Sequence, residues 1–153
     1  MLDKISNLFR KKEGSKEFVD GLGNFSLTYP QDWKYDPEIA YYDGKYSICF
    51  EGKGGTKFCV SIENSRNIDF EKMAIKRLGE PESGPIGEIK KAKFNDFNCV
   101  QKTFHYQQGK MQIMGKIILL MKNNKSIEIA EYYQEGNEEQ MKMIEKVEKS
   151  IKI

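Results

Sequence analysis

The chain has 153 residues, which is the size of one ordinary domain with room for a buried core. Hydrophobic residues make up 39% and charged residues 31%, a balance typical of a globular, soluble protein and not of a disordered one. The 25 Lys and Arg nearly balance the 23 Asp and Glu, leaving a net charge of +2. This near-neutrality argues against a dedicated nucleic-acid-binding protein, which usually carries a concentrated basic face.

The first segment predicts a short amphipathic helix joined to the rest by a polar linker, residues 1–17. Its apolar residues recur at helical spacing, and a basic group follows them. These are Leu2, Ile5, Leu8 and Phe9, then Arg10, Lys11, Lys12 and Lys16. A solvated tail is one interpretation, and weak docking of residues 2–12 on an anionic membrane surface is the other.

No stretch has the pattern of a signal peptide or the length of a membrane span, so we expect a cytoplasmic protein. The remaining residues, 18–153, are expected to form a single domain. Within it, Asn24 to Tyr29 alternates as a strand that ends at Pro30. Trp33 follows in a turn and is expected to plug the end of this strand.

Two strands around the sequence GKGGT predict a β-hairpin. Placing Phe50 opposite Phe58 also pairs Ile48 with Val60 and Tyr46 with Ile62, which puts every large apolar residue on one face. The glycines resemble a phosphate-binding loop, but such a loop leads into a helix, and here a strand follows. We therefore interpret them as a hairpin tip.

The second half of the chain alternates helix and strand in a definite order. Residues 68–80 predict a helix that starts at Asp69 and buries Phe70, Met73, Ala74 and Leu78. Residues 88–94 predict a lysine-rich edge strand. Three long strands then fill residues 98–133, and a helix that begins with a capping box at Asn137 and Gln140 closes the chain. Its inward stripe is Met141, Ile144, Val147 and Ile151.

The segment IILLM, residues 117–121, is apolar on both faces of a strand, which indicates a central strand covered on both sides. The fold class that follows is α+β, an α/β/α sandwich with a central, mostly antiparallel, twisted sheet flanked by helices. The helix near 69–78 is expected on one face. The C-terminal helix, with or without the N-terminal one, is expected on the other.

This order of elements resembles the PsbP-like superfamily, which also holds the Ran-binding Mog proteins and the DcrB-type domains. The resemblance rests on FSLTYPQDW, on FNDFNCVQKTFHY and on the terminal MKMIEKVEKSIKI, and it covers residues 18–153. Asp96 and Phe97 depart from it, because a glycine-bearing turn is usual there.

The resemblance implies interaction in place of catalysis. PsbP proteins are extrinsic subunits of photosystem II, Mog proteins bind a small GTPase, and some DcrB-like members act as adaptors for secreted effectors. These roles share no catalytic motif, so no functional residue carries over to this chain.

The hairpin register places Cys49 directly opposite Cys59, on the face away from Phe50 and Phe58. Such neighbours can form a disulfide or one corner of a metal site, but in a reducing cytosol we expect two free thiols. Cys99 has no obvious partner, and the spacing of the three cysteines and His105 matches no zinc signature. His105 lies on a strand with no nucleophile or carboxylate placed near it by the sequence, so we interpret it as structural.

We therefore expect a non-enzymatic protein-binding or adaptor domain with no cofactor, no metal and no nucleic-acid partner, which is able to form a homodimer. Tyr35, Tyr41 and Tyr42, in the stretch after Trp33, are the candidate contact residues, since amphipathic aromatic residues are enriched at interfaces. The alternative is a small-molecule-binding protein or an enzyme with a pocket between sheet and helix, beneath the hairpin, using His105 or Cys99. Membrane docking through residues 2–12 is the third hypothesis.

Overall fold

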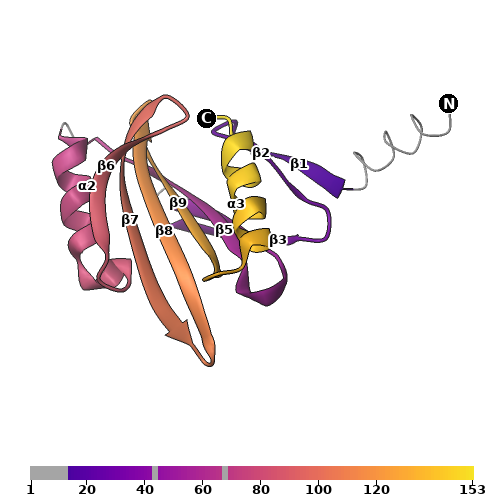
Figure 1. The fold of residues 1–153 in the computed structure, drawn as a ribbon. Coiled ribbons are helices and arrows are strands. Elements are labelled where there is room, and N and C mark those ends of the chain that lie inside the picture. Colours follow the sequence, from indigo (N-terminus) through magenta and orange to yellow (C-terminus); the bar gives the residue numbers. More distant parts are fainter. Residues whose placement is uncertain (1–13, 43–44, 67–68) are drawn as a thin grey trace.

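The computed structural model describes residues 14–42, 45–66 and 69–153, without the side chains of residues 37–42 (Figure 1). The elements are β1 (Ser15–Val19), β2 (Ser26–Pro30), β3 (Lys34–Tyr42), β4 (Lys45–Glu51), η1 (Lys53–Gly55), β5 (Lys57–Asn64), α2 (Phe70–Gly79), η2 (Pro81–Ser83), β6 (Glu88–Phe94), β7 (Phe97–Gln108), β8 (Met111–Lys122), β9 (Lys125–Gln134) and α3 (Glu138–Ser150). The fold is α+β and is dominated by antiparallel sheet. The predicted N-terminal helix and its basic group before Gly14 lie outside the described residues.

Seven strands form one antiparallel sheet in the order β3-β4-β5-β9-β8-β7-β6, and β1 and β2 form a separate hairpin. The predicted register of β4 and β5 is confirmed, because Phe50 pairs with Phe58 and Cys49 with Cys59. The lysine-rich strand β6 lies at an edge, as predicted. The IILLM segment lies in β8, between β9 and β7, and its first four side chains are buried, which also agrees with the prediction.

One face of the sheet is covered by α3 and by the β1–β2 hairpin (Figure 1). The core there combines apolar side chains of α3 and of the hairpin with those of six sheet strands, from Phe50 in β4 to Phe94 in β6. The Ser150 hydroxyl at the end of α3 accepts from the Thr28 amide at 2.9 Å, which ties helix and hairpin together. We call this side the α3 face. The predicted helix therefore shares its face with a hairpin.

The opposite side, the α2 face, is covered only in part. Ala74 and Leu78 of α2 pack on Val100, Phe104 and other side chains of β7 and β8, and Figure 1 shows α2 beside β6 and β7. No described helix lies over this side of β4, β5 and β9, so half of the face is left open.

Local signals start both helices as predicted. The Asp69 carboxylate accepts from the Lys72 amide at 3.2 Å, and the Asn137 side chain accepts from the Gln140 amide at 3.1 Å. The capping box at Asn137 is only half formed, because the Gln140 side chain accepts from the Gln134 amide in β9 instead of the Asn137 amide. That bond joins the helix start to the sheet.

Two boundaries differ from the prediction. Ser15 already belongs to β1, which pairs with β2 from Ser15 to Val19, so the expected linker ends three residues early. Residues 34–42, expected to be irregular, form the edge strand β3, because β4 offers a free edge and Pro37 is tolerated where no second partner is needed. The tight turns at Asn95–Asp96 and Asn123–Asn124 use positive φ angles without glycine.

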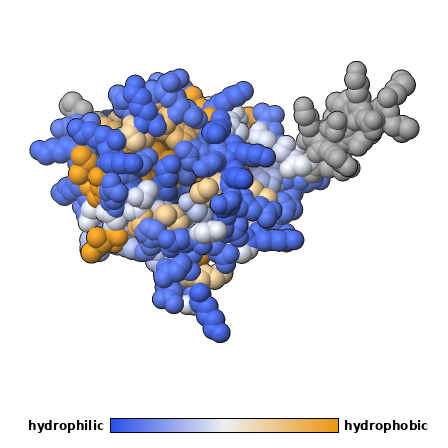
Figure 2. Space-filling view, in the orientation of Figure 1, coloured by the Kyte–Doolittle hydropathy of each residue, from blue (hydrophilic) through white to orange (hydrophobic). Residues whose placement is uncertain are grey.

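The surface seen in Figure 2 is mostly hydrophilic, with apolar residues confined to small patches. Large hydrophobic side chains that are exposed among the described residues are few and separate along the chain: Val19, Leu22, Tyr35, Ile75 and Ile86. Neither described helix combines the length and the apolar character required to span a membrane.

Candidate functional site

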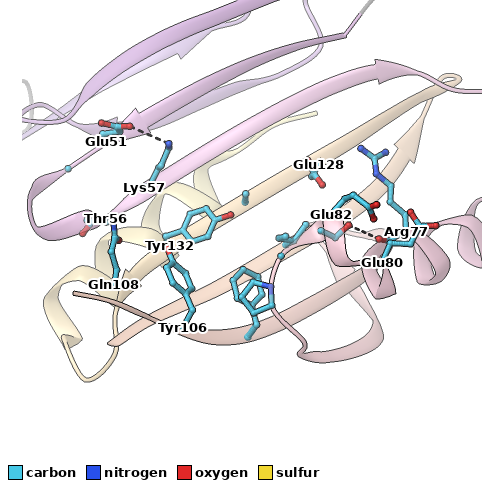
Figure 3. A pocket seen from close by; sticks show the side chains of 18 of the residues that line it. Glu51, Thr56, Lys57, Arg77, Glu80, Glu82, Tyr106, Gln108, Glu128 and Tyr132 are labelled. Atoms are coloured by element: carbon cyan, nitrogen blue, oxygen red, sulfur yellow. Dashed lines mark hydrogen bonds and ion pairs between the residues drawn. The ribbon is translucent and has the colours of Figure 1, made fainter. Parts of the chain in front are cut away.

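A groove of about 1000 Å³ lies on the open half of the α2 face (Figure 3). Its floor is formed by side chains of β9, β8 and β7, one wall by the end of α2 and η2, and the other by the β4–β5 hairpin. A concave surface of this size that combines apolar and polar groups is the usual form of a ligand site. It is therefore the candidate functional site.

Three aromatic rings form the apolar part of the floor. The Tyr106 and Tyr132 rings lie 6.3 Å apart at 80°, and Phe104 lies 6.2 Å from Tyr132 at 67°. Near-perpendicular rings at this spacing have the edge-to-face geometry that aromatic pairs prefer. Phe104 is buried, whereas both tyrosines are half-buried and line the groove.

Gly115 in β8 makes room for these rings. It pairs with Phe104 on one side and with Tyr132 on the other. A Cβ atom built on Gly115 would lie 2.4 Å from two atoms of the Phe104 ring, a distance that no real contact reaches. The Phe104 ring therefore lies flat over the glycine, and any larger residue would push it into the groove. The sequence analysis missed this role.

The half-buried charges of the groove differ in how they are neutralised. Lys57 pairs with Glu51 at 3.4 Å and Arg77 pairs with Glu63 at 3.6 Å. Glu128 has neither an ion-pair nor a hydrogen-bond partner within the part of the chain that the structure describes. It lies on β9, on the same face as Ala130 and Tyr132, so it is part of the floor.

The groove perturbs one of its own titrating groups. Burial raises the pKa of Tyr132, and the neighbouring Tyr106 and the Glu128 carboxylate raise it further. The Tyr132 hydroxyl thus lies in partly desolvated surroundings, where it can donate a hydrogen bond.

Cys49 and Cys59 form a disulfide on the α2 face, so the expectation of two free thiols is wrong. Their Cα atoms lie only 4.1 Å apart in directly opposed strand positions, which brings the sulfurs together. Cys59 pairs on its other side with Ala130 in the groove floor. The sequence had revealed the pairing but not the oxidation state, which depends on the surroundings of the protein.

The predicted contact residues do not gather at the groove. Tyr35 is 49% exposed, but its ring packs on those of Phe18, Tyr29 and Phe50 at the edge of the α3 face. The side chains of Tyr41 and Tyr42 lie outside the described residues.

His105 and Cys99 also lie on the α3 face, across the sheet from the groove. His105 is half-exposed, and its Nδ1 lies 3.3 Å from Glu135, a carboxylate partner that the sequence did not reveal because the turn into α3 supplies it. Cys99 is buried, and this burial raises the pKa of its thiol. In the described part of the chain, no three His, Cys, Asp or Glu side chains are grouped to hold a metal ion.

A buried acid on the α3 face was also missed. Glu131 is 1% exposed, and its Oε1 atom has no hydrogen-bond partner among the residues that the structure describes. Burial, a hydrogen bond with Glu148 and the charge of Glu148 raise its pKa well above the ordinary range, although Lys116 acts in the opposite sense. Lys116 donates to both Glu148 oxygens at 3.4 Å. The signal was present, because Lys116 and Glu131 interrupt the apolar rows of β8 and β9 at paired positions.

No protein-family model and no curated protein matches the sequence, but solved structures match the fold. Cyanobacterial PsbP (CyanoP) from Synechocystis matches with a TM-score of 0.61 at 11% identity, over 92% of this chain and 93% of that one. LpqN, a Mycobacterium tuberculosis protein involved in cell envelope biogenesis, matches with a TM-score of 0.53 at 11% identity, over 94% and 93%. The fold is therefore PsbP-like.

A protein from Bacteroides thetaiotaomicron matches with a TM-score of 0.60 at 17% identity, over 91% of this chain. This chain spans only 48% of that protein's length.

Proposed function

We propose that the protein is a non-enzymatic binding domain of the PsbP-like type, an α/β/α sandwich that receives a small molecule in the groove of the α2 face. The observation that carries the proposal is the open half of this face, where Tyr106, Tyr132 and Glu128 line one concavity. Among the described residues, no nucleophile with an adjacent base lies in the groove, so its groups support binding and orientation.

The adaptor role expected from the sequence has less support. An adaptor surface requires a contiguous exposed apolar patch of several hundred Å². The exposed hydrophobic side chains instead lie apart: Val19 and Leu22 on the β1–β2 hairpin, Ile75 on α2, and Ile86 beside the groove wall. Ile86, which is 99% exposed, follows Pro85, a residue that lines the groove.

The test is a ligand-observed NMR screen of a fragment library against the wild type and two variants. Ala130→Phe fills the floor of the groove, and Gln112→Phe adds the same side chain at an exposed position of β8. We expect fragments that bind the wild type and Gln112→Phe but not Ala130→Phe. Hits that bind all three equally, or no hits at all, would contradict the proposal.

The Cys49–Cys59 disulfide supports a location where thiols become oxidised, in preference to the reducing cytosol expected from the sequence. Trapping of free thiols in intact cells, followed by mass spectrometry, tests this point. Cys49 and Cys59 blocked by the trapping reagent would favour the cytosol. A bonded pair would favour an oxidising compartment.

A further inference from the structure

We infer that the groove binds a small organic cation with an apolar body, an arylalkyl ammonium compound, whose charge pairs with Glu128 while its apolar part lies against Tyr106 and Tyr132. This inference rests on the proposed function and names the ligand class for the same site. It follows from the charges, the rings and the length of the floor.

The charge argument depends on which half-buried groups already have partners. Lys57 and Arg77 are each paired with a carboxylate, and Lys45, the third basic residue of the lining, is exposed to water, so none of them is a desolvated cation that would favour an anion. Glu128 is half-buried without such a partner among the described residues, and the carboxylates of Glu80 and Glu82 lie on the adjacent wall. A partly desolvated carboxylate gains most from a cation that replaces its lost hydration.

The aromatic argument depends on how the rings face the groove. Figure 3 shows the Tyr132 and Tyr106 rings side by side at one end of the floor, with Glu128 toward the other end. The Lys102 Nζ atom lies 5.6 Å from the centre of the buried Phe104 ring, so the cation of the ligand belongs at the Glu128 end and not at the rings. The ring of the ligand packs on Tyr106 and Tyr132 in the offset or edge-to-face arrangements that aromatic pairs prefer.

The length of the floor fixes the shape of the ligand. Glu128, Ala130 and Tyr132 alternate along β9 on the same face, so about 13 Å of extended chain separate the Cα atoms of Glu128 and Tyr132. A ligand that reaches both ends carries its ammonium group several bonds away from its ring. The small side chain of Ala130 leaves space for the connecting chain.

The test uses three probes of the same framework, which are 4-phenylbutylammonium, 4-phenylbutanol and 4-phenylbutyrate. Their affinities are measured by protein-observed NMR titration of the whole chain. We expect the ammonium probe to bind and to shift the amide signals of Glu128, Ala130 and Tyr132. The neutral and anionic probes are expected to bind at least tenfold more weakly, because they lack the charge-assisted bond.

Variants separate the two parts of the site. Glu128→Gln should weaken the ammonium probe about tenfold, and Glu128→Lys should exchange the preference toward 4-phenylbutyrate. Glu17→Gln, at an exposed position of β1, is the matched control that should leave binding unchanged. Tyr132→Phe keeps the aromatic ring and should bind the ammonium probe nearly as the wild type does, whereas Tyr132→Leu loses the ring–ring contact and should bind it several-fold more weakly.

The outcomes distinguish this inference from the proposed function. If the anionic or neutral probe binds the groove as tightly as the cation, the ligand class is wrong while the groove remains a binding site. If a lysine-containing peptide binds in the groove and the free ammonium probe does not, the small-molecule ligand is overturned in favour of a protein partner. If none of these probes binds, and if Ala130→Phe leaves fragment binding unchanged, both the ligand class and the proposed function are wrong.

Discussion

On the α3 face, strands β4, β5 and β9 are covered by α3 and the β1–β2 hairpin, whereas on the α2 face the same strands are open to the groove. The charges follow this division. On the closed side Glu131 is held among Lys116, Glu148 and Glu145, and burial raises the pKa of its carboxyl well above the ordinary range. On the open side Glu128, three residues earlier in the same strand, has no partner of its own in the described structure. The closed face thus provides stability, and the open face leaves a partly exposed carboxylate available to a ligand.

The largest expected effect tests the closed face. Phe50 is fully buried, and its ring packs on those of Phe18, Tyr29 and Tyr35. Phe50→Ala should lower the free energy of unfolding by about 3–5 kcal/mol, measured by urea denaturation. Tyr132→Leu in the half-open floor should cost clearly less. Equal losses in the free energy of unfolding would contradict the comparison, because the two faces would then contribute equally to stability.

The disulfide is expected to have the next largest effect. It joins residues 10 positions apart, a loop whose closure in the unfolded chain corresponds to about 2–3 kcal/mol of stability. The unfolded wild type should show one reactive thiol, Cys99, and reductant should lower the denaturation midpoint. The Cys49→Ala/Cys59→Ala double variant should not respond to reductant. Three reactive thiols without reductant would contradict the bond.

The pH dependence of stability tests the buried acid of the closed face, Glu131. Because its pKa is raised in the folded protein, its contribution to stability is complete below the ordinary Glu range and is lost as pH rises through the folded value. Glu131→Gln cannot ionise, so it should flatten the pH dependence and stabilise the protein by about 1–3 kcal/mol on the alkaline side. Glu128→Gln, on the open face of β9, is the control with little effect. The same pH profile for wild type and Glu131→Gln would rule out a buried neutral acid.

The smallest effect is expected at the exposed rim. His105 and Glu135 lie 3.3 Å apart with side chains that are 53% and 46% exposed. Glu135→Gln should change the free energy of unfolding by less than about 1 kcal/mol at any pH, since water screens such pairs. Thermal unfolding of the wild type and the variant across pH measures this change. A loss larger than this would contradict the prediction and would show that the pair with His105 is important for stability.

Alternation of apolar residues allowed much of the fold to be predicted. The register of β4 with β5, the central position of IILLM and the starts of both helices followed from period-two or period-3.6 patterns and from capping residues, and the structure agrees. β3 was missed because its pairing depends on a neighbouring strand edge and not on its own alternation.

The groove was harder to predict, because its elements are distant in sequence. Tyr106, Tyr132 and the η2 wall meet only once β7, β8 and β9 are in register. Two signals were nevertheless present in the strand sequences. Glycine within β8 indicated the close approach of a ring, and charged residues at paired positions of β8 and β9 indicated the buried acid.

The central claim is that ligand binding belongs to the open α2 face. The most direct test is a map of amide chemical-shift changes over the whole chain when a bound fragment is titrated. The account predicts changes at Tyr106, Glu128, Ala130, Tyr132 and the η2 segment, with α3 and the β1–β2 hairpin unaffected. Changes concentrated on α3, on the hairpin or around Tyr35 would contradict it.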